Sequence, residues 1–128
     1  AGDMKLFANL VRQAKPENQI FSAVDAMLYS SYTLGAPGAI AAILTAAPGP
    51  SVRLWNAVID KDWDTALDLH ERLMPLWDAI GVDNMPSLCK YAQQLQGLDA
   101  GVARRPTSPA TEEQKQLVRS ALKNLDLI

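Results

Sequence analysis

The chain has 128 residues, of which 48% are hydrophobic and 20% charged, and its formal net charge is −2. This composition is typical of one globular domain with a real core and does not indicate disorder. Because Lys and Arg share the expected helix faces with Asp and Glu, no basic field marks a nucleic-acid partner, and we expect none.

The cysteine and histidine counts limit the sites that this chain can hold. Cys89 is the only cysteine and His70 the only histidine, so the sequence predicts no internal disulfide and no metal site. A single thiol fits a reducing cytoplasm, where we expect the protein to be. No stretch reaches the roughly 18 apolar residues of a membrane span, so we expect no membrane partner. The first three residues lack an initiator Met and the features of a signal peptide, and we interpret them as a cut end.

The chain begins with a predicted helix and a predicted strand. Residues 4–14 carry apolar side chains at helical spacing, and Pro16 prevents the helix from continuing far. Residues 19–24 form a short apolar run, which we interpret as a β-strand. The first helix therefore leads into the first strand.

A second strand is predicted from the longest apolar run. Between the two runs the pattern is helical, with Asp25 placed to cap this helix and Gly35 placed to stop it. The unbroken run from Leu34 to Pro48 then predicts a strand that is buried on both faces, centred on residues 39–43. Strand, helix and strand in this order form one βαβ unit with parallel strands.

The sequence after Pro48 is entirely helical in pattern. Asp62 is a good amino-terminal cap for the longest helix, which Pro75 should kink, and Thr111 opens the last helix with a capping box. The predicted helices span residues 50–61, 63–80, 86–96 and 111–125. Two parallel strands cannot complete a sheet beside this helical mass. We therefore divide the chain into residues 1–61, which carry the strands, and a helical domain of residues 62–128.

Several short motifs match one family in order and spacing. They are Ala1-Gly2-Asp3, Ala23-Val24-Asp25, Leu34-Gly35-Ala36-Pro37-Gly38-Ala39-Ile40, Lys61-Asp62-Trp63-Asp64-Thr65-Ala66 and Arg104-Arg105-Pro106-Thr107-Ser108-Pro109. They resemble the carboxy-terminal part of the dihydrodipicolinate synthase and N-acetylneuraminate lyase family of class I aldolases. The resemblance implies an α/β fold: the last two parallel strands of a (β/α)8 TIM barrel with their helices, followed by a helical domain. As a fragment, the chain should be mostly helical.

The resemblance also implies a chemistry. The family's lysine forms a Schiff base with pyruvate or another 2-keto acid, and the protonated imine then accepts electrons during carbon–carbon cleavage or formation. By this resemblance the lysine lies upstream of Ala1, so the chain holds no catalytic residue and should be inactive in isolation. The implied partners are a small 2-keto acid, a missing amino-terminal barrel half and, in the parent protein, further copies of itself. No cofactor is implied. Aldolase, synthase and dehydratase activity all remain open.

The expected substrate-lining residues are Ala23, Asp25, Ile40 and Ala41, because active sites of such barrels lie at the carboxyl ends of the strands. In the family's sugar-acid members, the aspartate matching Asp25 reaches substrate hydroxyls, and the residue matching Ile40 lies beside the keto acid. Asp25 has the alternative role of a helix cap, and both roles can hold. Ala23 replaces the family's usual glycine and narrows the space there.

We expect three other residues with reactive side chains to have structural roles and no catalytic ones. We expect His70 to be exposed or interfacial, Cys89 to be buried packing, and Lys90 to lie on a solvated or salt-bridged helix face. One alternative function remains beside the enzyme. The chain could be a non-catalytic helical interaction module that pairs with a separate amino-terminal half.

Overall fold

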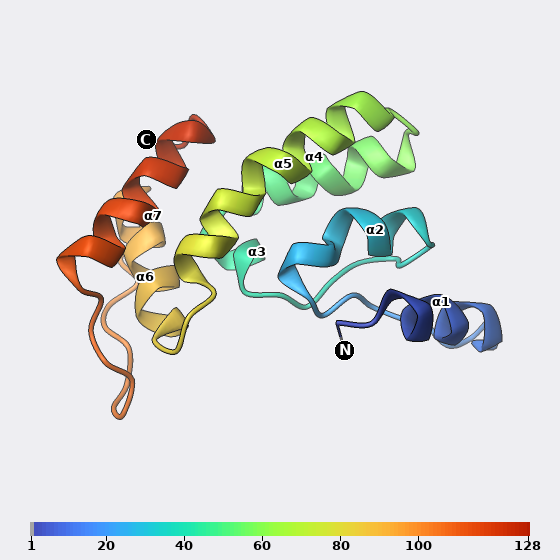
Figure 1. The fold of residues 1–128 in the computed structure, drawn as a ribbon, viewed down its shortest axis with the longest axis horizontal. Coiled ribbons are helices and arrows are strands. Elements are labelled where there is room, and N and C mark those ends of the chain that lie inside the picture. Colours follow the sequence, from blue (N-terminus) through green and yellow to red (C-terminus); the bar gives the residue numbers. More distant parts are fainter. Residues whose placement is uncertain (1) are drawn as a thin grey trace.

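The computed structural model describes residues 2–128 and consists mainly of helices (Figure 1). Ala1, the first residue of the Ala1-Gly2-Asp3 motif, lies outside the described residues. The helices are α1 (Met4–Gln13), the short 3-10 helix η1 (Asp25–Met27), α2 (Leu28–Thr33), α3 (Ile43–Ala46), α4 (Pro48–Ile59), α5 (Trp63–Ile80), α6 (Met85–Leu95) and α7 (Glu112–Asn124). The prediction of a mostly helical chain is confirmed.

Local capping chemistry sets several of these boundaries. The Asp62 carboxylate accepts a hydrogen bond from the Thr65 N–H at 3.2 Å, which confirms the predicted start of α5. Thr111 and Gln114 satisfy each other's backbone N–H groups at the start of α7, so the predicted capping box is also confirmed. Gly35 follows α2 with φ of +99°, a left-handed conformation that glycine adopts without strain.

The predicted strand between Leu34 and Pro48 is wrong. The run divides into the turn that follows α2, an extended segment, helix α3 and the start of α4. A continuous apolar run is compatible with a buried strand or a buried helix, and here the burial of Ile43 and Ala46 is achieved by a helix. Pro48 occupies the first position of α4, where its missing N–H costs no hydrogen bond.

Side chains distant in sequence stabilise both ends of the four-residue helix α3. At its start, the Ile43 N–H donates to Asp25 Oδ1 at 2.6 Å. At its end, Gln93 donates to the carbonyl of Thr45 at 3.1 Å, and Gln96 donates to that of Ala46 at 2.7 Å. These contacts satisfy groups that a short helix leaves open, which explains why the segment from Ile43 onward is helical.

The two predicted strands are reduced to a single parallel bridge between Ser22 and Ala39. The Ser22 N–H donates to the Gly38 carbonyl at 3.0 Å, and the Ile40 N–H donates to the Ser22 carbonyl at 2.8 Å. The two segments are therefore adjacent and parallel, as predicted. The predicted strand lengths of residues 19–24 and 39–43 are wrong, because only one bridge forms. No further strand lies beside this pair among residues 2–128, and an isolated pair of strands is at best marginal in water.

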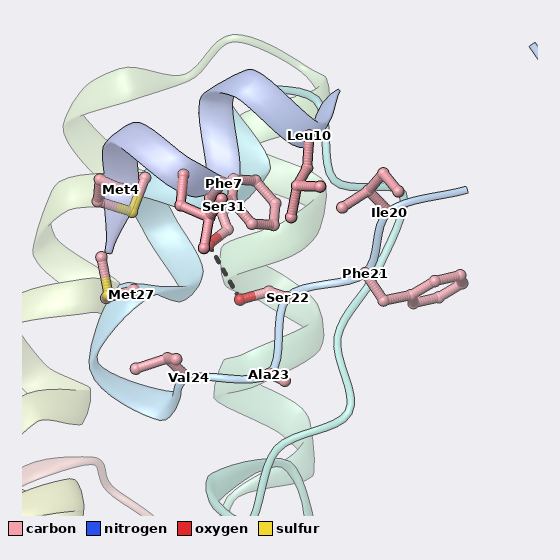
Figure 2. A pocket seen from close by; sticks show the side chains of 11 residues that line it. Met4, Phe7, Leu10, Ile20, Phe21, Ser22, Ala23, Val24, Met27 and Ser31 are labelled. Carbon is pink, nitrogen blue, oxygen red and sulfur yellow. Dashed lines mark hydrogen bonds between the residues drawn. The ribbon is translucent and has the colours of Figure 1, made fainter. Parts of the chain in front are cut away.

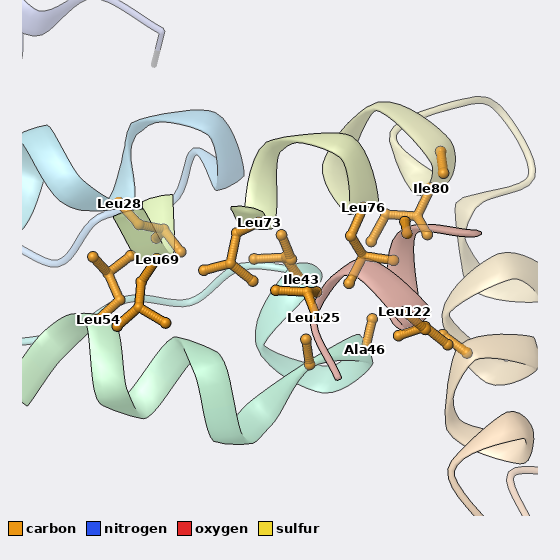
Figure 3. Close-up of a cluster of buried hydrophobic side chains, with 14 of the residues drawn as sticks. Leu28, Ile43, Ala46, Leu54, Leu69, Leu73, Leu76, Ile80, Leu122 and Leu125 are labelled. Carbon is orange, nitrogen blue, oxygen red and sulfur yellow. The ribbon is translucent and has the colours of Figure 1, made fainter. Parts of the chain in front are cut away.

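The core is one cluster of buried side chains that extends from α2 to the residues after α7 (Figure 3). Helix α5 is central and packs against α4 on one side and α7 on the other. Its Leu76 and Ile80 are fully buried, as are Leu54 of α4 and Leu122 of α7. The cluster crosses the boundary that we predicted after residue 61, and the division into two domains stays a prediction.

Helix α1 is peripheral by comparison. None of its residues is buried, and Leu6 and Leu10 are 45% and 47% exposed. It lies over the segment that contains Ile20 and Ser22 and leaves a small cavity between them (Figure 2). None of the helices in residues 2–128 combines the length and the hydrophobicity that a membrane span requires.

Candidate functional site

The carboxyl ends of the two bridged segments meet at one side of the molecule. The bridge joins Ser22 to Ala39 in parallel, so Ala23 and Ile40 are the next residues on neighbouring segments. Ala23 is exposed, and the Ile40 side chain is 77% exposed, the second highest value among the large apolar residues. Ala41 is half-buried. The backbone thus brings three of the four expected lining residues into one region.

Asp25 joins this region through its own hydrogen bond. The residue is half-buried, and its Oδ1 accepts from the Ile43 N–H at the first residue of α3. The predicted cap of its own helix is wrong, because η1 begins at Asp25 itself and Val24 precedes it without a side-chain cap. Asp25 instead caps a helix 18 residues away. The fold decides this role, since the partner comes from a different segment.

The second carboxylate oxygen of Asp25 remains available. Among residues 2–128, no hydrogen bond to Oδ2 and no salt bridge to Asp25 is present. A half-buried carboxylate with one free oxygen is a strong hydrogen-bond acceptor for a hydroxyl, an amine or a protonated imine. The geometry therefore provides recognition of a polar molecule. The described residues contain no group of three His, Cys, Asp or Glu that could hold a metal.

A buried serine pair lies on the other side of the bridged segment. Ser22 Oγ donates to Ser31 Oγ at 3.0 Å, and both residues are 2% exposed (Figure 2). The pair borders a largely apolar cavity of about 110 Å³ under α1, with Phe7, Leu10 and Met27 among its lining residues. The two hydroxyl groups satisfy each other, so this contact is structural. This contact was not predicted from the sequence, although a serine inside an otherwise apolar run is a visible signal.

The model of the Dihydrodipicolinate synthetase family matches residues 1–125. The chain belongs to this family. The 4-hydroxy-tetrahydrodipicolinate synthase of Archaeoglobus fulgidus is 31% identical over 128 residues, which are 100% of this chain and 44% of that protein. The chain therefore spans less than half the length of this curated relative.

Solved structures of the dihydrodipicolinate synthetase family have the same fold over this region. A dihydrodipicolinate synthase from Cyanidioschyzon merolae with lysine bound superposes with a TM-score of 0.88 at 26% identity, covering 100% of this chain and 43% of its own. An N-acetylneuraminate lyase from Fusobacterium nucleatum in complex with pyruvate gives 0.83 at 26% identity, covering 96% of this chain and 42% of its own. This family member matches the carboxy-terminal part of such proteins, and the resemblance read from its motifs is confirmed.

Cys89 and Lys90 are neighbours with different surroundings in this family member. Cys89 is 8% exposed, as expected, and burial raises the pKa of its thiol, while the Thr45 side chain acts in the opposite direction. Lys90 is half-buried, and its Nζ donates to the Ala100 carbonyl at 2.5 Å. The predicted solvated or salt-bridged face is therefore wrong. Lys90 holds the loop after α6 against that helix, as does Gln94, which donates to the Gly101 carbonyl.

His70 lies on α5, on the side that packs against α2. It is half-buried and stacks on Tyr29 with ring centroids 5.6 Å apart. Burial lowers the pKa of His70 below its usual value of 6.5, and the neighbouring Glu71 opposes this shift only in part. The imidazole is therefore mostly neutral at pH 7. Its contact with an aromatic ring, rather than with a carboxylate or a nucleophile, makes it a packing residue.

Proposed function

We propose that this chain forms the carboxy-terminal part of a Schiff-base-forming lyase that acts on pyruvate or another 2-keto acid. The parent is proposed to be a (β/α)8 barrel, a homo-oligomer and a cytoplasmic protein. Family membership supports the reaction class, and the similarity to a lyase crystallised with pyruvate supports the substrate class. The observation that carries the assignment of the site is the half-buried Asp25 carboxylate at the carboxyl ends of parallel segments, where barrel enzymes bind substrates.

The chain's own residues form a wall of this proposed site. The free Oδ2 of Asp25 accepts a hydrogen bond from a substrate hydroxyl, while Oδ1 stays on the Ile43 N–H and fixes the carboxylate. Ile40 and Ala41 provide an apolar surface and backbone groups beside the keto acid. The Ala23 methyl group narrows the space in the proposed site at the end of the first bridged segment. The catalytic lysine belongs to the part of the parent that precedes residue 1, and no cofactor is needed.

Reductive trapping tests this proposal. The lysine amine condenses with the ketone of pyruvate and releases water, and borohydride then reduces the C=N bond to a stable secondary amine. The parent protein should gain one such adduct per chain, on a lysine that precedes residue 1, as located by peptide mass spectrometry. The isolated 128-residue chain should gain none. An adduct on Lys90, or no adduct in the folded parent, would refute the assignment.

The second candidate function is a non-catalytic helical module that pairs with a separate amino-terminal half. The continuous helical core and the single bridge among residues 2–128 favour it, because the helices from α4 onward share one buried core without a sheet. The two functions predict different encoded proteins: the lyase is one polypeptide that contains both parts, whereas the module is encoded separately from its amino-terminal partner. If the amino-terminal part is a separate polypeptide and pyruvate is not trapped by the assembled pair, the module is the better description.

A further inference from the structure

Helix α3 depends on α6 for its place in the fold. The two helices pack against each other (Figure 1). The Gln93 side chain of α6 donates to the Thr45 carbonyl at 3.1 Å. Gln96, directly after α6, donates to the Ala46 carbonyl at 2.7 Å. A helix of one turn has few hydrogen bonds of its own, so these contacts from outside set the direction of α3.

The opposite end of α3 holds the Asp25 carboxylate. The Ile43 N–H donates to Asp25 Oδ1 at 2.6 Å, and Oδ2 has no partner in the described chain. The terminal torsion of an aspartate side chain has broad minima, so a carboxylate held through one oxygen turns when that partner moves. The direction of the free Oδ2 therefore depends on where α3 presents the Ile43 N–H.

A second observation places Asp25 near the same face of α6. Burial is the main cause that raises the pKa of the Cys89 thiol, the Thr45 side chain opposes it, and the negative charge of Asp25 raises it further. Cys89 precedes Gln93 by four residues, so the two side chains lie on one face of the helix. Asp25, α3 and this face of α6 are therefore neighbours.

We propose that Gln93 is a positioning residue for Asp25, because it fixes α3 so that the free Oδ2 is directed toward a substrate hydroxyl. The inference rests on the proposed function, in which Asp25 recognises such a hydroxyl. It adds that α6 takes part in substrate selection, although Gln93 itself touches no reacting atom. A Gln93 with a structural role alone affects all substrates equally, whereas a positioning residue affects only substrates that carry a hydroxyl.

The test measures aldehyde selectivity of the intact parent protein, with pyruvate as the keto acid. D-glyceraldehyde and propanal have the same carbon chain, and only D-glyceraldehyde carries hydroxyl groups beside the aldehyde. In each addition, C3 of pyruvate bonds to the aldehyde carbon, and the aldehyde oxygen takes up the proton that C3 loses. The measured quantity is the ratio of kcat/KM for D-glyceraldehyde to kcat/KM for propanal.

Gln93→Met keeps the length of the side chain and removes its donor, so this ratio should fall about three- to tenfold. Asp25→Asn should lower it about tenfold or more. The double variant should show no further loss, because Gln93 acts through Asp25. Gln94→Met is the matched control, since Gln94 is exposed on the same helix and its amide reaches the Gly101 carbonyl. It should leave the ratio unchanged.

Hydrogen exchange tests the same contact without activity. The Ile43 N–H should exchange several-fold faster in Gln93→Met than in the wild type or Gln94→Met. Unchanged Ile43 exchange, an unchanged ratio in the folded variant, or additive losses in the double variant would overturn the proposal. A wild-type parent that adds neither aldehyde would also overturn it.

Borohydride trapping of the wild-type parent with pyruvate separates the two levels of the argument. A lysine adduct together with an unchanged ratio in Gln93→Met refutes the positioning role alone. The absence of an adduct in the folded parent refutes the lyase function and, with it, the positioning role.

Discussion

At the scale of single residues, the Asp25 carboxylate combines a structural bond with a free acceptor. Oδ1 holds the first N–H of α3 at 2.6 Å, and Oδ2 is unpaired in the described chain. Two substitutions of Asp25 separate these two roles. Asparagine keeps an oxygen for the cap and loses the charge, whereas alanine loses both.

Asp25→Asn should leave the thermal stability of the parent almost unchanged and reduce kcat/KM for a hydroxylated substrate about 10- to 100-fold. This range corresponds to one charged hydrogen bond. Asp25→Ala should reduce activity similarly and also cost about 1 kcal/mol of unfolding free energy. Steady-state kinetics and thermal unfolding measure the two effects. Asp64→Asn, at an exposed position of α5, is the control. Equal activity of the Asn variant and the wild type would show that Asp25 is a helix cap alone.

His70 predicts a pH dependence of stability. Because burial lowers the pKa of His70 in the folded chain below 6.5, the unfolded state binds the proton more tightly. The stability that the neutral imidazole contributes is therefore present above pH 6.5 and decreases as the pH falls below that value. His70→Gln should flatten this part of the stability profile, measured by urea denaturation between pH 5 and pH 8 at intervals of about half a unit. An unchanged slope in the variant would assign the dependence to other groups.

At the scale of elements, α3 shows how a four-residue helix persists. Asp25 caps its first turn. Gln93 of α6 and Gln96, which directly follows α6, donate to the carbonyls of its last turn. A helix this short is unstable alone, because forming its first turn fixes several residues for one hydrogen bond. The three side chains and the burial of Ile43 and Ala46 together offset that cost.

Gln96→Ala should therefore destabilise the protein by about 1 kcal/mol, since its amide donates to the carbonyls of both Ala46 and Ala92. The matched control is Gln94→Ala, two residues earlier in the last turn of α6, because Gln94 is exposed and its amide reaches only the Gly101 carbonyl. It should cost clearly less. Chemical denaturation with unchanged m-values measures both variants. A larger loss for the Gln94 variant would contradict the role assigned to α6.

At the scale of the whole molecule, the helical core and the bridged segments differ in completeness. The helices from α4 onward surround fully buried side chains such as Leu54, Leu76 and Leu122. The bridged segments instead have an open edge, an exposed Ile40 and an apolar groove that Gly38 and Val52 line. Apolar surface and unpaired edges of this kind favour association with another chain or segment.

The isolated 128-residue chain should therefore associate with itself as its concentration rises, while its helical content remains high. Light scattering at several concentrations, together with circular dichroism, measures this behaviour. Val52→Asp should reduce the association, because it charges the groove, and Leu117→Asp should reduce it less. A concentration-independent monomer with one cooperative melt would show that the bridged segments need no further cover.

Particular elements show how far the sequence alone was sufficient. The start of α5 at Asp62 and the capping box at Thr111 were predictable, because capping depends on residues only three positions apart. The motifs also identified the family correctly. The region between Leu34 and Pro48 was not predictable in the same way, because an apolar run is equally compatible with a strand and with a buried helix.

The sequence by itself determined the family, the helical character of the chain and the ends of its capped helices, since these depend on local spacing. Only the tertiary structure decided that Asp25 caps α3, that Gln96 closes its other end, and that Lys90 binds the Ala100 carbonyl. Each of these contacts joins different elements of the chain. The packed core fixes how those elements are placed relative to one another. The helix or strand propensity of a residue does not specify that placement.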